Sequence, residues 1–178
     1  MQQMLANLRA RREDERGFTL IELMVVVLII AILIAIAIPT FLGAKSRAQD
    51  KAAQSSLRNA VTNAKAIYTD TNDYVSATPA ALLAAEPSLS FNAAGTASTG
   101  PKNVSVATSL AAASPSWVVL TSLSAAGNCF AIADSTQYGT MFKVSSGACD
   151  ATTIGAPLGS IPTANSTATV GGTWASSW

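Results

Sequence analysis

The sequence predicts an α+β protein in which one long N-terminal helix packs on a small antiparallel β-sheet. Three observations support this fold class. Residues 23–38 form an unbroken apolar run, and residues 43–74 carry apolar side chains at helical spacing. Four strand-like runs then follow between residues 102 and 145. At 178 residues, the chain has room for one modest domain with appended segments.

The first part of the helix, residues 18–42, has the length of a membrane span. Only four of its residues are not plainly apolar: Thr19, Glu22, Pro39 and Thr40. A helix of this length reaches about 37 Å at about 1.5 Å per residue, and a bilayer core of about 30 Å needs roughly 20 residues. Pro39 removes one backbone hydrogen bond, so we expect it to bend or loosen the preceding turn.

Residues 43–74 continue the helix with one apolar side and one solvated side. The apolar residues recur at steps of three and four, namely Ala48, Ala52, Leu57, Ala60, Val61, Ala64, Ile67 and Tyr68. Charged residues fill the positions between them. The poor helix formers of residues 69–73 predict the end of a helix of roughly 50 residues.

Residues 75–150 predict a β-rich globular head. Thr78 and Pro79 are the cap and first residue of a short helical turn through Ala85. The strand-like runs cover residues 102–108, 117–123, 128–134 and 140–145. Strands adjacent in sequence favour an antiparallel meander, with one face on the apolar side of the long helix. Residues 151–178, rich in Gly, Ser and Thr, predict a poorly ordered tail.

Composition argues against two classes of function. The chain has eleven Lys and Arg, ten Asp and Glu, and no His. Residues 1–17 hold four of the basic and three of the acidic residues, which leaves seven of each and a neutral body. A neutral body disfavours nucleic-acid binding through a basic patch. The lack of His and of a Gly-x-Ser-x-Gly motif disfavours a membrane-anchored enzyme.

Three interpretations compete for residues 1–42. A secretory signal peptide would be cut after its apolar core, but here the core continues into the amphipathic helix with no cleavage site directly after it. A plain signal anchor explains the apolar run and the basic leader but not the carboxylate of Glu22 inside the span. The third interpretation uses the hexapeptide of residues 17–22, Gly-Phe-Thr-Leu-Ile-Glu, where the polar leader meets the apolar helix.

This hexapeptide resembles the cleavage and methylation site of type IV prepilins and of the pseudopilins of type II secretion. The resemblance implies a pilin-like fold, removal of a leader at residues 1–17 by a membrane peptidase, and N-methylation of the new terminus, Phe18. Gly17 then precedes the cut, Glu22 is the family's acidic residue, and Pro39 matches its helix-interrupting proline. The implied function is a structural subunit of a type IV pilus-like filament, and the alternative is a pseudopilin. No cofactor or metal is implied.

The resemblance also implies partners and a location. The partners are copies of the chain, related minor pilins, the prepilin peptidase and methyltransferase, an inner-membrane assembly platform and, before assembly, the lipid bilayer. The subunit would cross the cytoplasmic membrane once, with the leader inside and the head outside, before joining a cell-surface or extracytoplasmic filament. The lack of a basic patch in residues 75–178 weighs against a tip subunit that binds DNA directly.

Charge chemistry gives Glu22 a role in this scheme. A carboxylate near an apolar span costs about 2 to 3 kcal/mol or more without a partner. No Lys or Arg lies within one helical turn of Glu22. Cleavage creates an α-amino cation at Phe18, and the amine of a neighbouring subunit can pair with Glu22 and set the register. The alternative is that Glu22 reaches only to the lipid headgroups. For Pro39, a simple bend without a mechanical role is equally compatible.

Cys129 and Cys149 are the two cysteines, and both fall in the predicted exported head. Two cysteines in a secreted β-rich region predict a disulfide, and many pilins carry a C-terminal bridge. Two thiols without a His disfavour a metal site.

Overall fold

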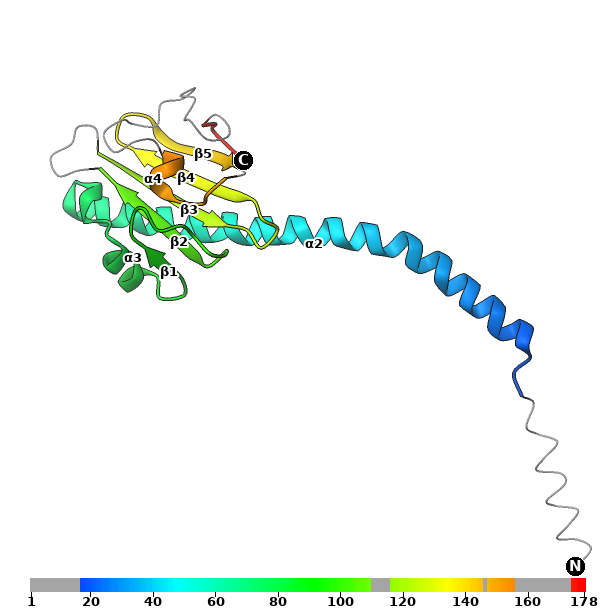
Figure 1. Ribbon diagram of the computed structural model, residues 1–178. Helices are drawn as coiled ribbons and strands as arrows, with labels where there is room; N and C mark the ends of the chain where they lie inside the picture. The colour runs from blue at the N-terminus through cyan, green and yellow to red at the C-terminus, as the bar shows by residue number, and fades with distance from the viewer. Residues whose placement is uncertain (1–16, 110–115, 146, 156–173) are drawn as a thin grey trace, which may run out of the picture. The chain divides into compact units, whose positions relative to one another are not determined.

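The computed structural model describes residues 17–109, 116–145, 147–155 and 174–178 (Figure 1). The chain divides into two compact units, Met1–Gly43 and Ala44–Trp178, and each is described by itself. We call the second the head unit. The predicted α+β fold class is confirmed, with a long N-terminal helix and a five-stranded, mostly antiparallel sheet.

Helix α2 runs from Leu20 to Thr71. Its 52 residues agree with the predicted length of roughly 50. The helix ends within residues 69–73, the poor helix formers that predicted its end. Asn72 adopts a left-handed backbone with φ of 58°, and its N–H donates to the carbonyl of Tyr68 at 2.7 Å. A left-handed residue directly after the last turn is a common way to end a helix, and Asn tolerates it well.

The sheet has the strand order β1-β2-β3-β4-β5 (Figure 1). The strands are β1 (Ser90–Asn92), β2 (Asn103–Thr108), β3 (Trp117–Leu123), β4 (Cys129–Ser135) and β5 (Gly139–Ser145). Strands β2 to β5 form the predicted antiparallel meander. Strand β1 was not predicted and pairs with β2 in parallel.

Two short helices precede the sheet. Helix α3 (Pro79–Ala85) begins as predicted, since Thr78 is its N-cap and accepts a hydrogen bond from the N–H of Ala81. The 3₁₀ turn η1 (Tyr74–Ser76) links α2 to α3, and Asp73 caps it by accepting from the N–H of Val75. The buried Tyr74 of η1 and Leu82 of α3 join the hydrophobic core.

One face of the sheet packs on the head-unit part of α2. Small side chains on this part of the helix are fully buried and let it approach the strands closely. The predicted apolar stripe is correct from Leu57 onwards, but Ala48 and Ala52 are exposed, and Ala53 is buried instead. This core consists mainly of Ala53, Leu57, Ala60, Ala64, Val104, Val106, Val118, Leu120, Phe130 and Ile132.

The opposite face of the sheet is covered by the two described ends of residues 151–178. Helix α4 (Ala151–Gly155) and Trp174 pack on this face, and Ala175 pairs with Phe142 on β5. The poorly ordered tail stays a prediction, and its middle, residues 156–173, lies outside the described residues. Apolar side chains on both faces of the central strands require this second cover.

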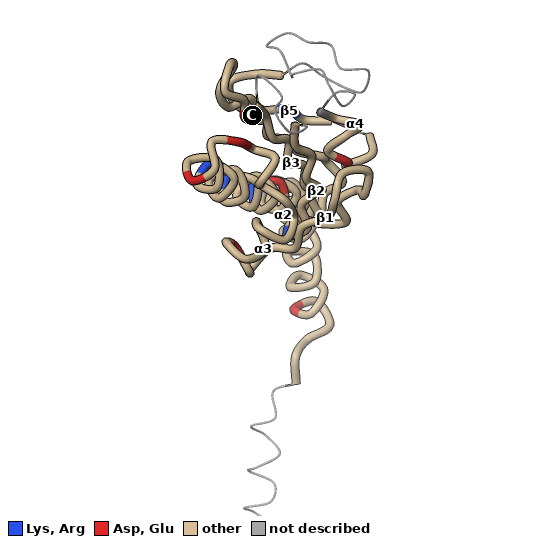
Figure 2. The backbone as a smooth tube through the Cα atoms, turned by 90° about the vertical axis from the view of Figure 1, so that its left-hand side faces the viewer, with Lys and Arg blue, Asp and Glu red and all other residues tan. Residues whose placement is uncertain are grey.

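Polar contacts hold the ends of the helix–sheet interface. Five of the seven Lys and Arg residues of the head unit lie on α2 (Figure 2). One of them, Lys65, lies 2.8 Å from the buried carboxylate of Asp134, which also accepts from the Tyr74 hydroxyl at 2.6 Å. Fifteen residues earlier, Asp50 accepts from Ser124 at 2.6 Å, in the turn between β3 and β4. The two contacts orient the helix on the sheet at both ends.

Candidate processing and assembly segment

The backbone of residues 17–19 is not helical and is exposed. Gly17 and Phe18 lie before the first turn of α2, which begins at Leu20. The side chain of Phe18 is 80% exposed. The peptide bond between Gly17 and Phe18, the predicted site of cleavage, is therefore open to solvent and outside the helix.

Thr19 caps the helix. The N–H of Glu22 donates to the carbonyl oxygen of Thr19 at 3.1 Å and to its hydroxyl oxygen at 3.3 Å. The N–H of Leu23 donates to the same carbonyl at 3.2 Å. A threonine three residues before a glutamate is the spacing of a capping box, so Thr19 was recognisable from the sequence although only Glu22 was singled out.

From Leu20 to Leu42, every large hydrophobic side chain is between 49% and 78% exposed. The apolar window of this helix has a mean hydropathy of 3.3, and none of it is buried within the chain. Leaving such a side chain in water costs about 1.5 to 3 kcal/mol. The helix is long and apolar enough to cross a membrane, and its surface requires lipid or other protein as a neighbour.

Glu22 lies in the first turn of this apolar helix and is exposed. A carboxylate in the first turn interacts favourably with the helix dipole, by about 0.3 to 1 kcal/mol. Among the residues that the structure describes, Glu22 takes part in no salt bridge. Its carboxylate is available to a cation other than those of the described residues.

Pro39 lies inside α2 without ending it. Proline lacks the N–H that would bind the carbonyl four residues before it. The next residue, Thr40, donates its hydroxyl to the carbonyl oxygens of Ala37 at 2.9 Å and Ile36 at 3.3 Å. The carbonyl that Pro39 leaves without a helical donor is that of Ala35, so the Thr40 bonds add to the neighbouring carbonyls instead. Such back-bonding from a hydroxyl often accompanies a bend.

Residues 13–38 match the family model of the prokaryotic N-terminal methylation motif. The chain carries the type IV pilin and pseudopilin signature. The match includes Gly17, Phe18 and Glu22 and ends just before Pro39. No curated protein matches the chain, and no solved structure does. The pilin signature covers the N-terminal segment, and the described fold, a long helix with a mostly antiparallel sheet, is pilin-like in arrangement.

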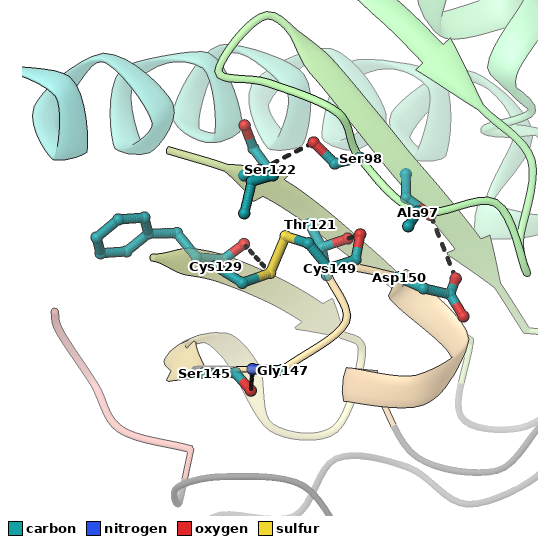
Figure 3. The surroundings of a disulfide bond; sticks show 12 residues. Ala97, Ser98, Thr121, Ser122, Cys129, Ser145, Gly147, Cys149 and Asp150 are labelled. Carbon is teal, nitrogen blue, oxygen red and sulfur yellow. Dashed lines mark hydrogen bonds between the residues drawn. A yellow bond between two sulfur atoms is a disulfide. The ribbon is translucent and has the colours of Figure 1, made fainter. Parts of the chain in front are cut away.

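In the head unit, Cys129 and Cys149 form a disulfide (Figure 3). Cys129 begins β4, and Cys149 immediately precedes Asp150 and helix α4. Both cysteines are buried, and the carbonyl of Cys149 accepts from Thr121 at 3.2 Å and from the N–H of Ser98 at 2.7 Å. The bridge and these hydrogen bonds attach the segment before α4 to the sheet.

Asp150 organises the start of α4. Its carboxylate accepts from the N–H of Gly95 at 3.0 Å and from the hydroxyls of Thr152 and Thr153. Burial by itself raises the pKa of Asp150, but the hydrogen bonds from Thr152, Thr153 and Gly95 together outweigh burial and hold that pKa below its ordinary value.

We expect Asp150 to make the stability of the head unit pH-dependent in acid. Because the folded-state pKa is lowered, its contribution is fully present above the unfolded value of about 4 and is lost as pH falls through the folded value. Thermal unfolding between pH 5 and pH 2 should show a steeper loss in the native protein than in Asp150→Asn. Parallel pH profiles for the two proteins would contradict this assignment.

Lys143 is buried on the sheet face that α4 covers. The residue is 2% exposed, and its Nζ lies 5.9 Å from the ring centroid of Trp174. Within the described part of the chain, this Nζ has no hydrogen-bond partner. Burial lowers the pKa of Lys143. The burial of Lys143 is not recognisable from the sequence, because a lysine in a half-exposed strand ordinarily points outward.

We expect Lys143→Met to stabilise the protein by about 1 to 2 kcal/mol at neutral pH, because it removes the cost of burying an amine. The unfolded state binds the proton more tightly, so native stability should rise with pH between the folded pKa and about 10.4. That rise should be absent in the variant. Urea unfolding at pH 7 and pH 10 measures both effects, and exposed Lys102→Met is the control. A destabilised Lys143→Met protein would contradict the prediction.

Proposed function

We propose that this chain is the precursor of a structural subunit of a type IV pilus-like filament. The single observation that carries the proposal is the exposed apolar part of α2, residues 20–42, which begins three residues after Gly17, within the methylation motif. A helix with this surface is stable in lipid, or in a polymer in which copies of it cover one another. Its function is assembly, and the chain needs no catalytic site for it.

The proposed domain plan follows from this function. Residues 1–17 form the leader that is removed. Residues 18–42 cross the membrane and later form the filament core, and residues 43–74 support the head. Residues 75–150 form the head, and residues 151–178 form a Gly-, Ser- and Thr-rich tail whose two described ends pack on the sheet. The leader would lie inside the cell and the head outside.

Maturation would create a new positive charge, the α-amine of Phe18, at the start of the apolar helix. Hydrolysis of the Gly17–Phe18 amide consumes one water, leaves a carboxylate on the leader and exposes the α-amine of Phe18. Methyl transfer to this amine from a methyl donor keeps it basic. In the polymer, the amine of one subunit would pair with Glu22 of its neighbour and set the axial register. Contacts of this type do not close on themselves, so they generate an open helical assembly.

The proposed partners are copies of this chain and related minor pilins, the prepilin peptidase and methyltransferase, the inner-membrane assembly platform, and the bilayer before assembly. Pro39, supported by Thr40, would let the apolar helix change its bend between lipid and filament. A simple static bend remains the alternative for Pro39.

A pseudopilin of type II secretion is the second candidate, because the methylation motif is shared by both groups. The disulfide in the head and the neutral body favour the surface pilus. The two functions differ in the length and place of the polymer, which are directly observable.

Two measurements test the proposed function. Mass spectrometry of assembled material should show a chain that starts at an N-methylated Phe18, and an intact leader in that material would disprove the proposed maturation. Electron microscopy of material sheared from the cell surface should show long filaments that an antibody to the head labels. Labelled polymer restricted to the envelope would instead support the pseudopilin.

A further inference from the structure

The start of α2 lies two residues after the proposed cleavage site. We propose that Thr19 is a positioning residue for cleavage. Its cap makes the helix begin at Leu20 and keeps the Gly17–Phe18 bond in an exposed, non-helical backbone. This inference rests on the proposed cut after Gly17. It concerns how the precursor presents that bond to its peptidase.

The hydrogen bonds at Thr19 engage the N–H of Glu22, which would bind one residue further back in a longer helix. In an α-helix, the N–H of Glu22 would donate to the carbonyl of Phe18, four residues earlier. Here that N–H donates to the carbonyl and hydroxyl oxygens of Thr19 instead. The first four-residue hydrogen bond comes from Leu23 to Thr19, so no helical bond reaches back to Gly17 or Phe18.

The chemistry of cleavage needs this boundary. Water must attack the Gly17 carbonyl carbon, and the bond to the Phe18 nitrogen must then break, with a proton delivered to the leaving amine. In a helix extended by two residues, the Gly17 carbonyl would accept from the N–H of Ile21. The Gly17 carbonyl oxygen would then be hydrogen-bonded, and the backbone on both sides of the scissile bond would be helical. An extended segment leaves backbone groups free to pair with a binding protein.

Without the cap, the helix would be expected to grow towards the leader. Residues 2–16 are rich in strong helix formers, including Gln, Leu, Ala, Arg and Glu. An apolar environment also favours helix extension, because it penalises unpaired N–H groups. Against this, Gly17 is a poor helix former, and Thr19 supplies a side-chain acceptor. The Thr19 hydroxyl therefore helps to determine whether the helix begins before or after the scissile bond.

The test compares cleavage rates of full-length precursors in membranes that contain the prepilin peptidase. Thr19→Val keeps the side-chain shape but removes the acceptor oxygen. We expect its kcat/KM for cleavage to fall about fivefold, which corresponds to about 1 kcal/mol at 1.4 kcal/mol per tenfold. Thr19→Ser and Thr19→Asn keep a capping oxygen and should stay within about twofold of the native rate.

A second pair of variants separates capping from direct recognition of Thr19 by the peptidase. Proline is well tolerated as the first residue of a helix, and it disfavours a helical residue before it. In precursors that carry Leu20→Pro, Thr19→Val should therefore cause no further loss. The same fivefold loss on that background, or a Thr19→Ser precursor as slow as Thr19→Val, would overturn the proposal.

The failure of this inference is distinguishable from failure of the proposed function. A native precursor that stays intact at Gly17–Phe18 would overturn the cut itself. A native precursor that is cut there, together with a Thr19→Val precursor cut at the same rate, would overturn only the role of Thr19.

Discussion

Glu22→Leu should leave the precursor inserted and cut after Gly17, yet reduce the yield of assembled filament by tenfold or more. The substitution makes the apolar helix more hydrophobic, so membrane insertion should not suffer. It removes the carboxylate proposed to pair with the Phe18 amine of a neighbouring subunit. In an apolar assembly, that amine would then be buried without a partner, at a cost of about 2 to 3 kcal/mol or more for each contact.

The matched control is Glu22→Gln, which keeps the length and shape of the side chain. If charge pairing is the main effect, Gln should lose most of the assembly that Leu loses, whereas Glu22→Asp should retain part of it. Sheared surface filament is compared with cleaved subunit in the membrane by immunoblot. If the Glu22→Leu protein gave as much filament as the native protein, Glu22 would interact only with the lipid headgroups or the helix dipole.

Removing the disulfide should have the largest effect on the stability of the head. The bond closes a loop with a sequence separation of 20 residues, and the chain-entropy model assigns about 3 kcal/mol to such a loop. The loop from Cys129 to Cys149 contains both β4 and β5. Without the bridge, the segment before α4 would depend on the hydrogen bonds of Cys149, Asp150 and their neighbours.

Urea unfolding of the mature protein in detergent measures this effect on the double variant Cys129→Ala with Cys149→Ala. The native protein unfolded under reducing conditions is the matched control, because it loses the bond and keeps both sulfur atoms. The two should agree to within about 1 kcal/mol. A loss below about 0.5 kcal/mol in both would show that packing alone holds α4 on the sheet.

The local parts of the fold could be predicted because each depends on residues close in sequence. The unbroken apolar run predicted the exposed helix, and the poor helix formers near Asn72 predicted its end. Thr78 and Pro79 predicted the start of α3. The hexapeptide at Gly17 predicted the methylation motif that the family comparison confirmed at residues 13–38.

The parts that sequence analysis missed depend on residues far apart in the chain. Strand β1 has only three residues, and it exists because β2 lies beside it. Residues 151–155 and 174–178 have a composition typical of loops. Residues 151–155 and Trp174 pack on the second apolar face of the sheet, which Ala131 and Met141 help to form. Trp178 packs on the face towards α2, against Phe130 and Phe142.

By itself, the sequence determined that this chain has a long helix whose apolar surface is unfavourable in water, and that the helix begins within an N-terminal methylation motif. Hydrophobic periodicity and short motifs involve residues that are close together in the chain, so they can be recognised from the sequence alone. Tertiary structure alone decided that Asp50 and Lys65 hold the helix to the sheet, and that Lys143 is buried. Burial and hydrogen bonding depend on which distant residues fold against a side chain, and no local pattern records that choice.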